Sequence, residues 1–266
     1  MDYNKLCDDI VNWLIKYVEG NNLRGFVIGI SGGIDSAVVS KLCALTGYDL
    51  LCLEIPIGNT SSERNRAKGH IKELCRKHKN VRSEVVDLSG VFETYRETLN
   101  KTENHQSDDY SINLSLANLK SRLRMSCLYS MASINNYIVA GTGNKVEDFG
   151  IGFFTKGGDG CVDISPIADL MKSQVYLLGE IIGINDDILG AEPTDGLWDG
   201  AVTDEEQIGA SYVELEWAME YLENNTYEKG IASDLSDRKK EVLKIYNNFH
   251  KKNKHKMVEV PIFKIK

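Results

Sequence analysis

The stretch that decides the fold is Gly25-Phe26-Val27-Ile28-Gly29-Ile30-Ser31-Gly32-Gly33-Ile34-Asp35-Ser36. Its first half, up to Ile30, is short, apolar and β-branched, which is typical of a buried strand. The Ser31-Gly32-Gly33 break follows, and a helical pattern then runs from Ala37 to Leu45. The stretch therefore predicts a strand, a tight loop and a helix in succession.

The same alternation continues outward along the chain. An amphipathic helix is expected from Leu6 to Val18, with its end near Gly20. Further strands are expected at 50–55, 81–86 and 137–140, and further helices at 61–78, from Ser89, at 114–134 and near Lys172, Ser211 and Asp234. The strands lack a clean polar face, which suits a parallel sheet covered on both sides. We predict an α/β, doubly wound, mainly parallel sheet flanked by helices, with a helical carboxyl-terminal part, as one domain over 1–266.

Composition limits the function classes. The 266 residues are 42% hydrophobic and 26% charged, which excludes a disordered or fibrous chain. A net charge of −8 argues against broad nucleic-acid binding. Apolar runs fall far short of the ~20 residues of a membrane helix, and the first residues do not resemble a secretory signal. We expect a cytoplasmic protein whose six scattered cysteines are reduced core thiols.

The loop after the first strand is suited to binding an anion. Backbone N–H groups in the first turn of a helix have no intrahelical partner and carry the positive end of the helix dipole. Glycines let a phosphate approach closely, and Ser31 and Ser36 add hydroxyl donors. The stretch lacks the Gly-Lys-Ser/Thr of a P-loop and the Gly-x-Gly-x-x-Gly of a dinucleotide fingerprint. A different kind of phosphate loop is therefore predicted.

Asp35 lies inside this anion site. A carboxylate there would repel phosphate unless a cation lay between them, so Asp35 predicts a bridging Mg²⁺. The alternative is that Asp35 only caps the following helix. Glu147 follows the strand at 137–140, near the edge where doubly wound sheets bind ligands, and could join Asp35 on the metal. Its alternative is a solvated loop carboxylate.

Two sets of motifs carry a resemblance. Ser-Gly-Gly-x-Asp-Ser after a strand resembles the pyrophosphate loop of N-type ATP pyrophosphatases, which cleave ATP between the α- and β-phosphates. The remaining motifs resemble those of ammonia-dependent NAD synthetases over nearly the whole chain. They are Gly141-Thr142-Gly143-Asn144-Lys145-Val146-Glu147, Gly152-Phe153-Phe154-Thr155-Lys156, Gly158-Asp159-Gly160, Asp163-Ile164-Ser165-Pro166, Asn118-x-Lys120-x-Arg122-x-Arg124, Pro193-Thr194-Asp195-Gly196-Leu197-Trp198 and His255-Lys256.

The resemblance implies a homodimeric ligase. Such enzymes convert deamido-NAD, ATP and ammonia into NAD, AMP and pyrophosphate, with Mg²⁺ and through an acyl-adenylate. It places Gly29, Ile30, Ser31, Gly32, Gly33, Ile34, Asp35, Ser36, Thr142, Lys172 and Thr194 on ATP, and Arg122, Lys156, Asp163, His255 and Lys256 on deamido-NAD. It makes Asp35 and Glu147 the metal ligands, and Asp35, Lys156 and Lys172 the catalytic residues. For the lysines and His255 the alternative is a solvated surface position, most of all in the basic tail.

Several points stay open at this level. Asp163 could bind ammonium, but no general base is assigned. The stretches 101–110 and 191–202 are candidate lids, and the apolar positions Leu116, Leu119, Leu123, Cys127 and Met131 suit either core or a dimer face.

Some features depart from the family pattern or leave other assignments possible. Gly157 and Cys161 stand where an aromatic residue and a glycine are frequent, and the run 199–205 lacks a glutamine common in relatives. Other assignments are another N-type ATP pyrophosphatase acting on a different carboxylate or carbonyl, or a non-catalytic ATP-binding module. The chain has no length left for a glutaminase domain, so free ammonia is the expected nitrogen source; a separate glutaminase subunit stays open.

Overall fold

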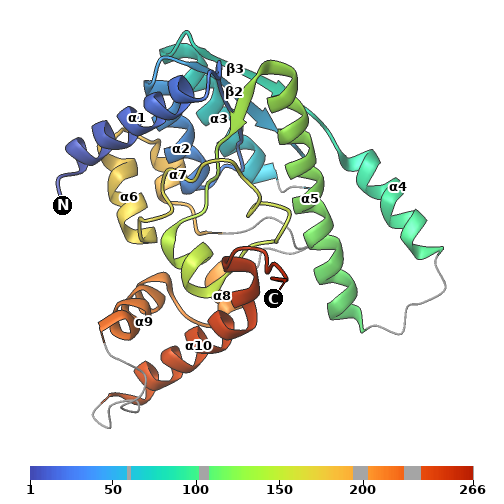
Figure 1. The fold of residues 1–266 in the computed structure, drawn as a ribbon, viewed down its shortest axis with the longest axis vertical. Helices are drawn as coiled ribbons and strands as arrows, with labels where there is room; N and C mark the ends of the chain where they lie inside the picture. The colour runs from blue at the N-terminus through green and yellow to red at the C-terminus, as the bar shows by residue number, and fades with distance from the viewer. Residues whose placement is uncertain (59–60, 102–107, 194–202, 225–234, 266) are drawn as a thin grey trace.

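The computed structural model describes residues 1–58, 61–101, 108–193, 203–224 and 235–265 (Figure 1). Four parallel strands form one sheet in the order β3-β2-β1-β4. The strands are β1 (Gly25–Gly29), β2 (Asp49–Glu54), β3 (Val81–Val85) and β4 (Tyr137–Val139). Because β2 and β4 flank β1 on opposite sides, the strand order reverses beside β1. Doubly wound sheets bind ligands at such a reversal, at the carboxyl ends of the strands.

Helices cover both faces of this sheet. The α-helices of the described part are α1 (Tyr3–Gly20), α2 (Ile34–Leu45), α3 (Ser61–Lys77), α4 (Ser89–Asn100), α5 (Asp109–Asn135), α6 (Lys172–Ile181), α7 (Asp186–Leu189), α8 (Asp204–Ile208), α9 (Tyr212–Asn224) and α10 (Asp237–Met257). Apolar residues of α1, α2, α3 and α6 pack on one face, and α5 packs on the other. The predicted fold class is confirmed.

Alternation along β1 explains why the strand is buried on both sides. Phe26 and Ile28 belong to the core shared with α1, α2 and α6, whereas Val27 belongs to the core under α5. Successive side chains of a strand point to opposite faces, so a strand between two helical layers must be apolar at every position. All three side chains are fully buried.

A third apolar core lies in the carboxyl-terminal part, where α8, α9 and α10 pack around a π-helix, η1 (Lys145–Ile151). Figure 1 shows α9 and α10 gathered beyond one end of the sheet. The Asn144 side chain caps η1 by accepting the Glu147 N–H, and Gly152 ends it at φ +63. The sequence predicts no helix between Gly141 and Gly160. π-Helices are rare in proteins overall, and those that do occur are often found at functional sites.

Element ends differ from expectation at a few places. Helix α2 begins at Ile34, three residues before the predicted Ala37. Helix α5 begins at Asp109, inside the stretch predicted as a loop, because Asp108 caps it by accepting the Ser111 N–H at 2.7 Å. Residues 102–107 of that stretch lie outside the described part, as does Asp234, where the last helix was expected to start. Within the described ranges, no helix has the length and apolarity needed to cross a bilayer.

Candidate active site

The loop between β1 and α2 is held by its own hydroxyls. The Ser31 N–H donates to Ser36 Oγ (3.3 Å), the Gly33 N–H donates to Ser31 Oγ (3.2 Å), and Ser36 Oγ donates to the Gly33 carbonyl (3.0 Å). Gly32 has φ +91, and a Cβ there would lie 2.5 Å from the Glu63 carbonyl oxygen. A glycine is thus required at 32 for both backbone conformation and space. The loop conformation is therefore supported by its own side chains and by Gly32.

Asp35 does not cap α2. The N-cap is Gly33, with no side-chain capping bond, so the first-turn N–H groups are not capped by a carboxylate. Asp35 instead points to a buried ion cluster: Lys172 Nζ lies 2.6 Å from Asp35 Oδ2 and 2.9 Å from Glu147 Oε1. The side chains are only 5%, 17% and 16% exposed for Lys172, Asp35 and Glu147. Glu147 is therefore no solvated loop carboxylate, and Lys172 no surface lysine.

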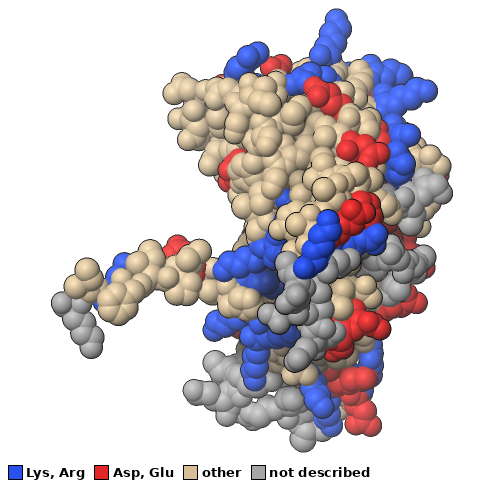
Figure 2. Space-filling view, turned by 90° about the vertical axis from the view of Figure 1, so that its right-hand side faces the viewer, with Lys and Arg blue, Asp and Glu red and all other residues tan. Residues whose placement is uncertain are grey.

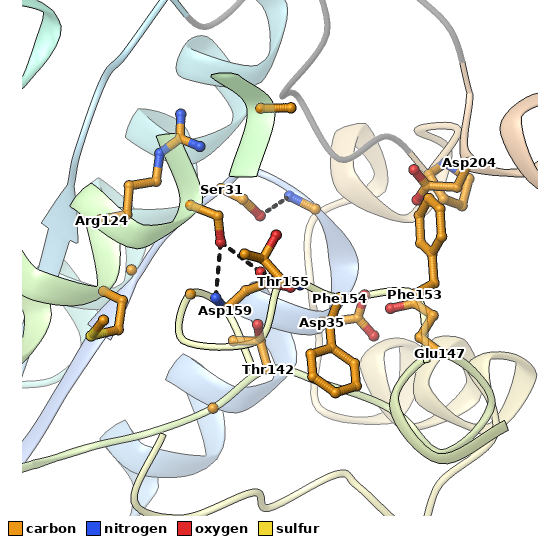
Figure 3. A pocket seen from close by; sticks show the side chains of 18 of the residues that line it. Ser31, Asp35, Arg124, Thr142, Glu147, Phe153, Phe154, Thr155, Asp159 and Asp204 are labelled. Carbon is orange, nitrogen blue, oxygen red and sulfur yellow. Dashed lines mark hydrogen bonds between the residues drawn. The ribbon is translucent and has the colours of Figure 1, made fainter. Parts of the chain in front are cut away.

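Neutral donors complete the cluster. The Tyr212 hydroxyl donates to Glu147 Oε1 (2.5 Å) and also contacts Asp204 Oδ2 (3.2 Å). Asn144 Nδ2 donates to Asp35 Oδ1 (3.3 Å). The Lys172 ammonium lies over the Tyr212 ring, 4.8 Å from its centre. Figure 3 shows Asp35, Glu147 and Asp204 at the same end of the cavity. Elements α2, η1, α6, α8 and α9 thus all contribute to one site.

The ionisation of the cluster follows from burial and charge. Burial alone would lower the pKa of Lys172, but Asp35 and Glu147 outweigh it and raise that pKa. Burial likewise opposes ionisation of Glu147, yet Lys172 and the Tyr212 hydroxyl hold its pKa below the usual value. For Asp35, burial and the neighbouring Glu147 raise the pKa against the effect of Lys172. The two carboxylates therefore favour the charged form of Lys172.

The donor set suits Mg²⁺ bound together with a nucleotide. Within the described ranges no three or more His, Cys, Asp or Glu side chains cluster as a metal site. Mg²⁺, however, usually takes one or two carboxylates and completes its shell with phosphate oxygens and water. Asp35 and Glu147 supply two such carboxylates beside the phosphate loop, so the residues fit that ion.

A cavity of ≈ 850 Å³ opens at the carboxyl ends of the strands and is lined by this loop and cluster. Its wall includes three arginines with no role predicted from the sequence: Arg64, Arg66 and Arg124. Arg66 Nε donates to the Gly32 carbonyl (3.1 Å) and Arg124 Nε to the Ile55 carbonyl (3.1 Å). Guanidinium groups are suited to phosphate, and these two are oriented by backbone contacts.

Helix α10 fastens one wall of the cavity. Asn253 Nδ2 donates to the Ile151 carbonyl (2.8 Å), Lys256 Nζ to the Phe154 carbonyl (2.7 Å), and Lys156 Nζ to the His255 carbonyl (2.9 Å). The His250 ring Nδ1 lies 2.6 Å from the Gly150 carbonyl. The end of η1 has carbonyls without intrahelical partners, and α10 satisfies them. The basic tail is thus part of the cavity wall.

The other predicted site residues are placed as follows. Arg122, Lys156 and His255 are exposed and Thr142 is half-buried, and all four line the cavity. Lys256 lines it too, half-buried over the Phe154 ring. Asp163 is not among the lining residues: its Oδ2 accepts the Val139 N–H (2.8 Å) and its Oδ1 the Tyr129 hydroxyl (3.1 Å). Thr194 lies outside the described residues.

Residues missed from sequence include Tyr212, Asp204 and Asn253. Tyr212 lies 65 positions from Glu147, and only the packing of α9 on η1 brings them together. No periodicity or motif marks its hydroxyl. Asn144 stood inside a recognised motif but received no role, although Asn after a strand and before a helix is a frequent capping residue.

Comparison with known proteins agrees with this geometry. Residues 6–260 match the family model described as NAD synthase. The NH(3)-dependent NAD(+) synthetase of Finegoldia magna is 37% identical over 240 residues, 90% of this chain and 91% of that protein. That of Methanococcoides burtonii is 33% identical over 258 residues, covering 95% and 94%. A solved NMN synthetase from Francisella tularensis superposes with TM-score 0.84 at 30% identity, covering 100% of both chains. This chain belongs to the NAD synthase family.

Proposed function

We propose that the chain amidates deamido-NAD with ammonia at the expense of ATP, giving NAD, AMP and pyrophosphate. Curated relatives at 37% and 33% identity over most of the chain are NH(3)-dependent NAD(+) synthetases. The observation that carries the proposal is the Asp35–Lys172–Glu147 cluster, buried directly beside a preformed phosphate loop in a cavity of ≈ 850 Å³. A phosphate-binding module without chemistry would not need two carboxyl groups and a lysine buried there.

The chemistry follows from bringing negative groups together. The nicotinate carboxylate attacks the α-phosphorus of ATP and expels pyrophosphate, and ammonia then attacks the acyl-adenylate and expels AMP. The loop N–H groups with Ser31 and Ser36 hold the phosphates, and Lys172 offsets the charge that develops there. Lys156 and Arg122 face the same cavity and suit the substrate's acidic groups. Catalysis is positioning plus charge neutralisation.

Asp35 and Glu147 are the residues that would hold Mg²⁺. When bound, the ion supplies charge neutralisation at the phosphates. Asp163 is proposed as an indirect contributor, because both carboxylate oxygens already accept hydrogen bonds from Val139 and Tyr129. His255 and Lys256 are proposed to contact the dinucleotide from α10, with Thr142 and Thr194 on the ATP side.

A second candidate substrate is the smaller nicotinate mononucleotide. The reason is the NMN synthetase of Francisella tularensis, which superposes over the full length of both chains at TM-score 0.84. Both substrates share the nicotinate carboxylate and one nucleoside phosphate, so the cluster and loop would serve either. They differ only in the adenylate half, which the remaining cavity wall must accept or exclude.

The test is a direct assay of the purified chain with Mg²⁺, ATP, ammonium and one of the two nucleotides. Amidated product and pyrophosphate are measured separately, with glutamine replacing ammonium in a parallel reaction. Ammonium-dependent NAD with equal pyrophosphate is expected. Product from the mononucleotide alone would transfer the proposal to the second substrate. ATP binding without turnover of either would leave a nucleotide-binding module, and pyrophosphate release with another acceptor would indicate a different ATP pyrophosphatase.

We also propose a cytoplasmic homodimer with one domain per chain. Val91 and Tyr95, one turn apart on α4, are about half exposed. Val260, Ile262, Phe263 and Ile265 after α10 are more than 70% exposed, and Figure 2 shows this segment as an arm that projects from the body. Of the apolar positions on α5, Cys127 and Met131 pack against the sheet core, and Leu116, Leu119 and Leu123 are half-buried. A second copy would cover such exposed apolar surface.

A further inference from the structure

The ammonium of Lys172 sits where a metal held by Asp35 and Glu147 would sit. It contacts Asp35 Oδ2 at 2.6 Å and Glu147 Oε1 at 2.9 Å, so one cation already bridges both carboxylates. The Lys172 side chain is only 5% exposed, so little water reaches this ammonium. The lysine, rather than solvent, therefore offsets the charge of the two carboxylates.

We propose that Lys172 occupies the cation position in the free chain and excludes Mg²⁺ until a nucleotide draws its ammonium away. The proposal rests on the Mg²⁺ site assigned under the proposed function. It makes Lys172 a competitor of the metal in the free chain and a phosphate ligand in the nucleotide complex. The nucleotide then promotes metal binding in two ways. It supplies phosphate oxygens to the metal, and it removes the competing ammonium from the carboxylates.

The charges support competition rather than coexistence. The two carboxylates and the ammonium sum to −1, and a divalent ion on the same two oxygens would stand within a few ångströms of another cation. Like charges that close and that buried repel strongly. Removing the ammonium leaves a pair of carboxylates, which is the ordinary protein contribution to a Mg²⁺ site.

The local backbone does not hold the ammonium in place. Lys172 is the first residue of α6, and the amino end of a helix carries partial positive charge, which disfavours a cation. Its retention therefore depends on the two carboxylates and on the Tyr212 ring, 4.8 Å away. Lys172 lines the same cavity as the phosphate loop, and a lysine stem is flexible. A triphosphate in that loop offers the ammonium a strongly anionic alternative.

The test measures metal binding without nucleotide or substrate, so its outcome is independent of which reaction the chain catalyses. Mn²⁺ is titrated into the wild type and Lys172→Gln, and free Mn²⁺ is followed by electron paramagnetic resonance. Lys172→Gln is expected to bind Mn²⁺ about tenfold more tightly or better, because the competing charge is gone. Equal affinity in the two proteins would overturn the proposal.

A matched control separates competition from net charge. Lys156→Gln removes the same charge from the same cavity, but Lys156 donates to the His255 carbonyl rather than to the carboxylates. Its Mn²⁺ affinity is expected to stay within about twofold of the wild type. If Lys156→Gln binds as tightly as Lys172→Gln, the effect is long-range electrostatics and the proposal fails.

A wild-type measurement covers the case in which Lys172→Gln does not fold. The ¹⁵N signal of a buried, hydrogen-bonded lysine ammonium is observable in the free chain, and Glu147→Gln identifies it by shifting it. Adding Mg²⁺ alone is expected to leave the signal in place, whereas Mg²⁺ with a non-hydrolysable ATP analogue is expected to move it. A shift of the same size with Mg²⁺ alone would show that the metal reaches the carboxylates without a nucleotide, and it would overturn the proposal.

Discussion

The Tyr212 hydroxyl reaches Glu147 Oε1 at 2.5 Å, while the ring of the same tyrosine lies beneath the Lys172 ammonium. One side chain thus stabilises both the anion and the cation of the cluster. It links α9 and η1, in the carboxyl-terminal helical part, to α6, which packs on the sheet. The ion cluster is consequently built across two apolar cores of the molecule.

Tyr212→Phe tests this link. The substitution keeps the ring under Lys172 but removes the donor to a buried carboxylate, so the free energy of unfolding should fall by about 1.5–3 kcal/mol. Urea unfolding followed by circular dichroism measures it. The control is Tyr3→Phe on α1, a half-buried tyrosine away from the ion cluster, which should change stability by less than ~0.5 kcal/mol. Equal losses in the two variants would contradict a specific role of the hydroxyl.

Glu147→Gln and Asp35→Asn test the metal ligands. Each replaces an ionised oxygen donor by a neutral amide of the same shape, so kcat at saturating ATP should fall about 100-fold, with a higher Mg²⁺ requirement. Initial rates over a Mg²⁺ series measure both quantities. Glu180→Gln, on an exposed position of α6, is the matched control. Unchanged Mg²⁺-dependent turnover in either ligand variant would remove that residue from the metal site.

His70 gives the chain a stability that depends on pH. It is 4% exposed and bonded to Ser40 Oγ at 2.8 Å, and burial lowers its pKa to about 4. In the unfolded chain the pKa of this histidine is ~6.5. Between the folded and unfolded pKa values the unfolded chain binds more protons than the folded chain, so the free energy of unfolding decreases as pH falls below ~6.5. His70→Gln should remove up to about 1.4 kcal/mol per pH unit of that loss. The measurement is the urea midpoint of unfolding for the wild type and His70→Gln from pH 4.5 to 7.5. If the midpoints of the two proteins change with pH in parallel, His70 does not have this role.

Asn253→Ala tests the wall that α10 completes. Losing the donor to the Ile151 carbonyl frees the end of η1 and the stretch leading to Lys156. KM for the nicotinate nucleotide should rise about tenfold, with a smaller change in kcat, because the reacting groups lie on other elements. Lys254→Ala, one residue along and exposed, should leave both constants near wild type. A fall in kcat alone would argue against a positioning role.

The exposed apolar residues Val91 and Tyr95 on α4 allow a test of the dimer. Sedimentation at micromolar concentration should give twice the 29.8 kDa of one chain for the wild type. A charge buried in an apolar interface is costly, so Tyr95→Glu should shift the chain to monomer. Val213→Glu introduces the same charge at another exposed position, on α9, and should stay dimeric. A wild type that sediments as a monomer would end the dimer proposal.

Local patterns were enough for the sheet. The run from Phe26 to Ile30 predicted a doubly covered strand because every side chain there must meet a helix on one face or the other. The loop glycines and Asp35 were recognisable because a phosphate site depends on residues adjacent in sequence. The family resemblance then proposed Glu147 and Lys172, which the structure brings into contact with Asp35.

Partners distant in sequence were not predictable in this way. η1 has seven residues and the wider turn of a π-helix, so the 3.6-residue pattern misses it. Tyr212 was expected only as part of a helix near Ser211, since nothing local shows what its hydroxyl meets. The same limit applies to Asp163: the family resemblance placed it on deamido-NAD, but nothing local in the sequence shows that its carboxylate accepts from the Val139 N–H and the Tyr129 hydroxyl.

The hydrogen bonds that join α10 to the end of η1 affect the order in which the chain folds during synthesis. His250 reaches a carbonyl 100 residues earlier, and Asn253 and Lys256 each reach one 102 residues earlier. Loops of that length close late, after local contacts have formed. During synthesis the sheet and phosphate loop can therefore assemble while the cavity wall is still missing. A nascent chain would form its nucleotide-binding loop well before it could enclose a reactive adenylate. The chain therefore becomes able to complete the reaction only after α10 has folded.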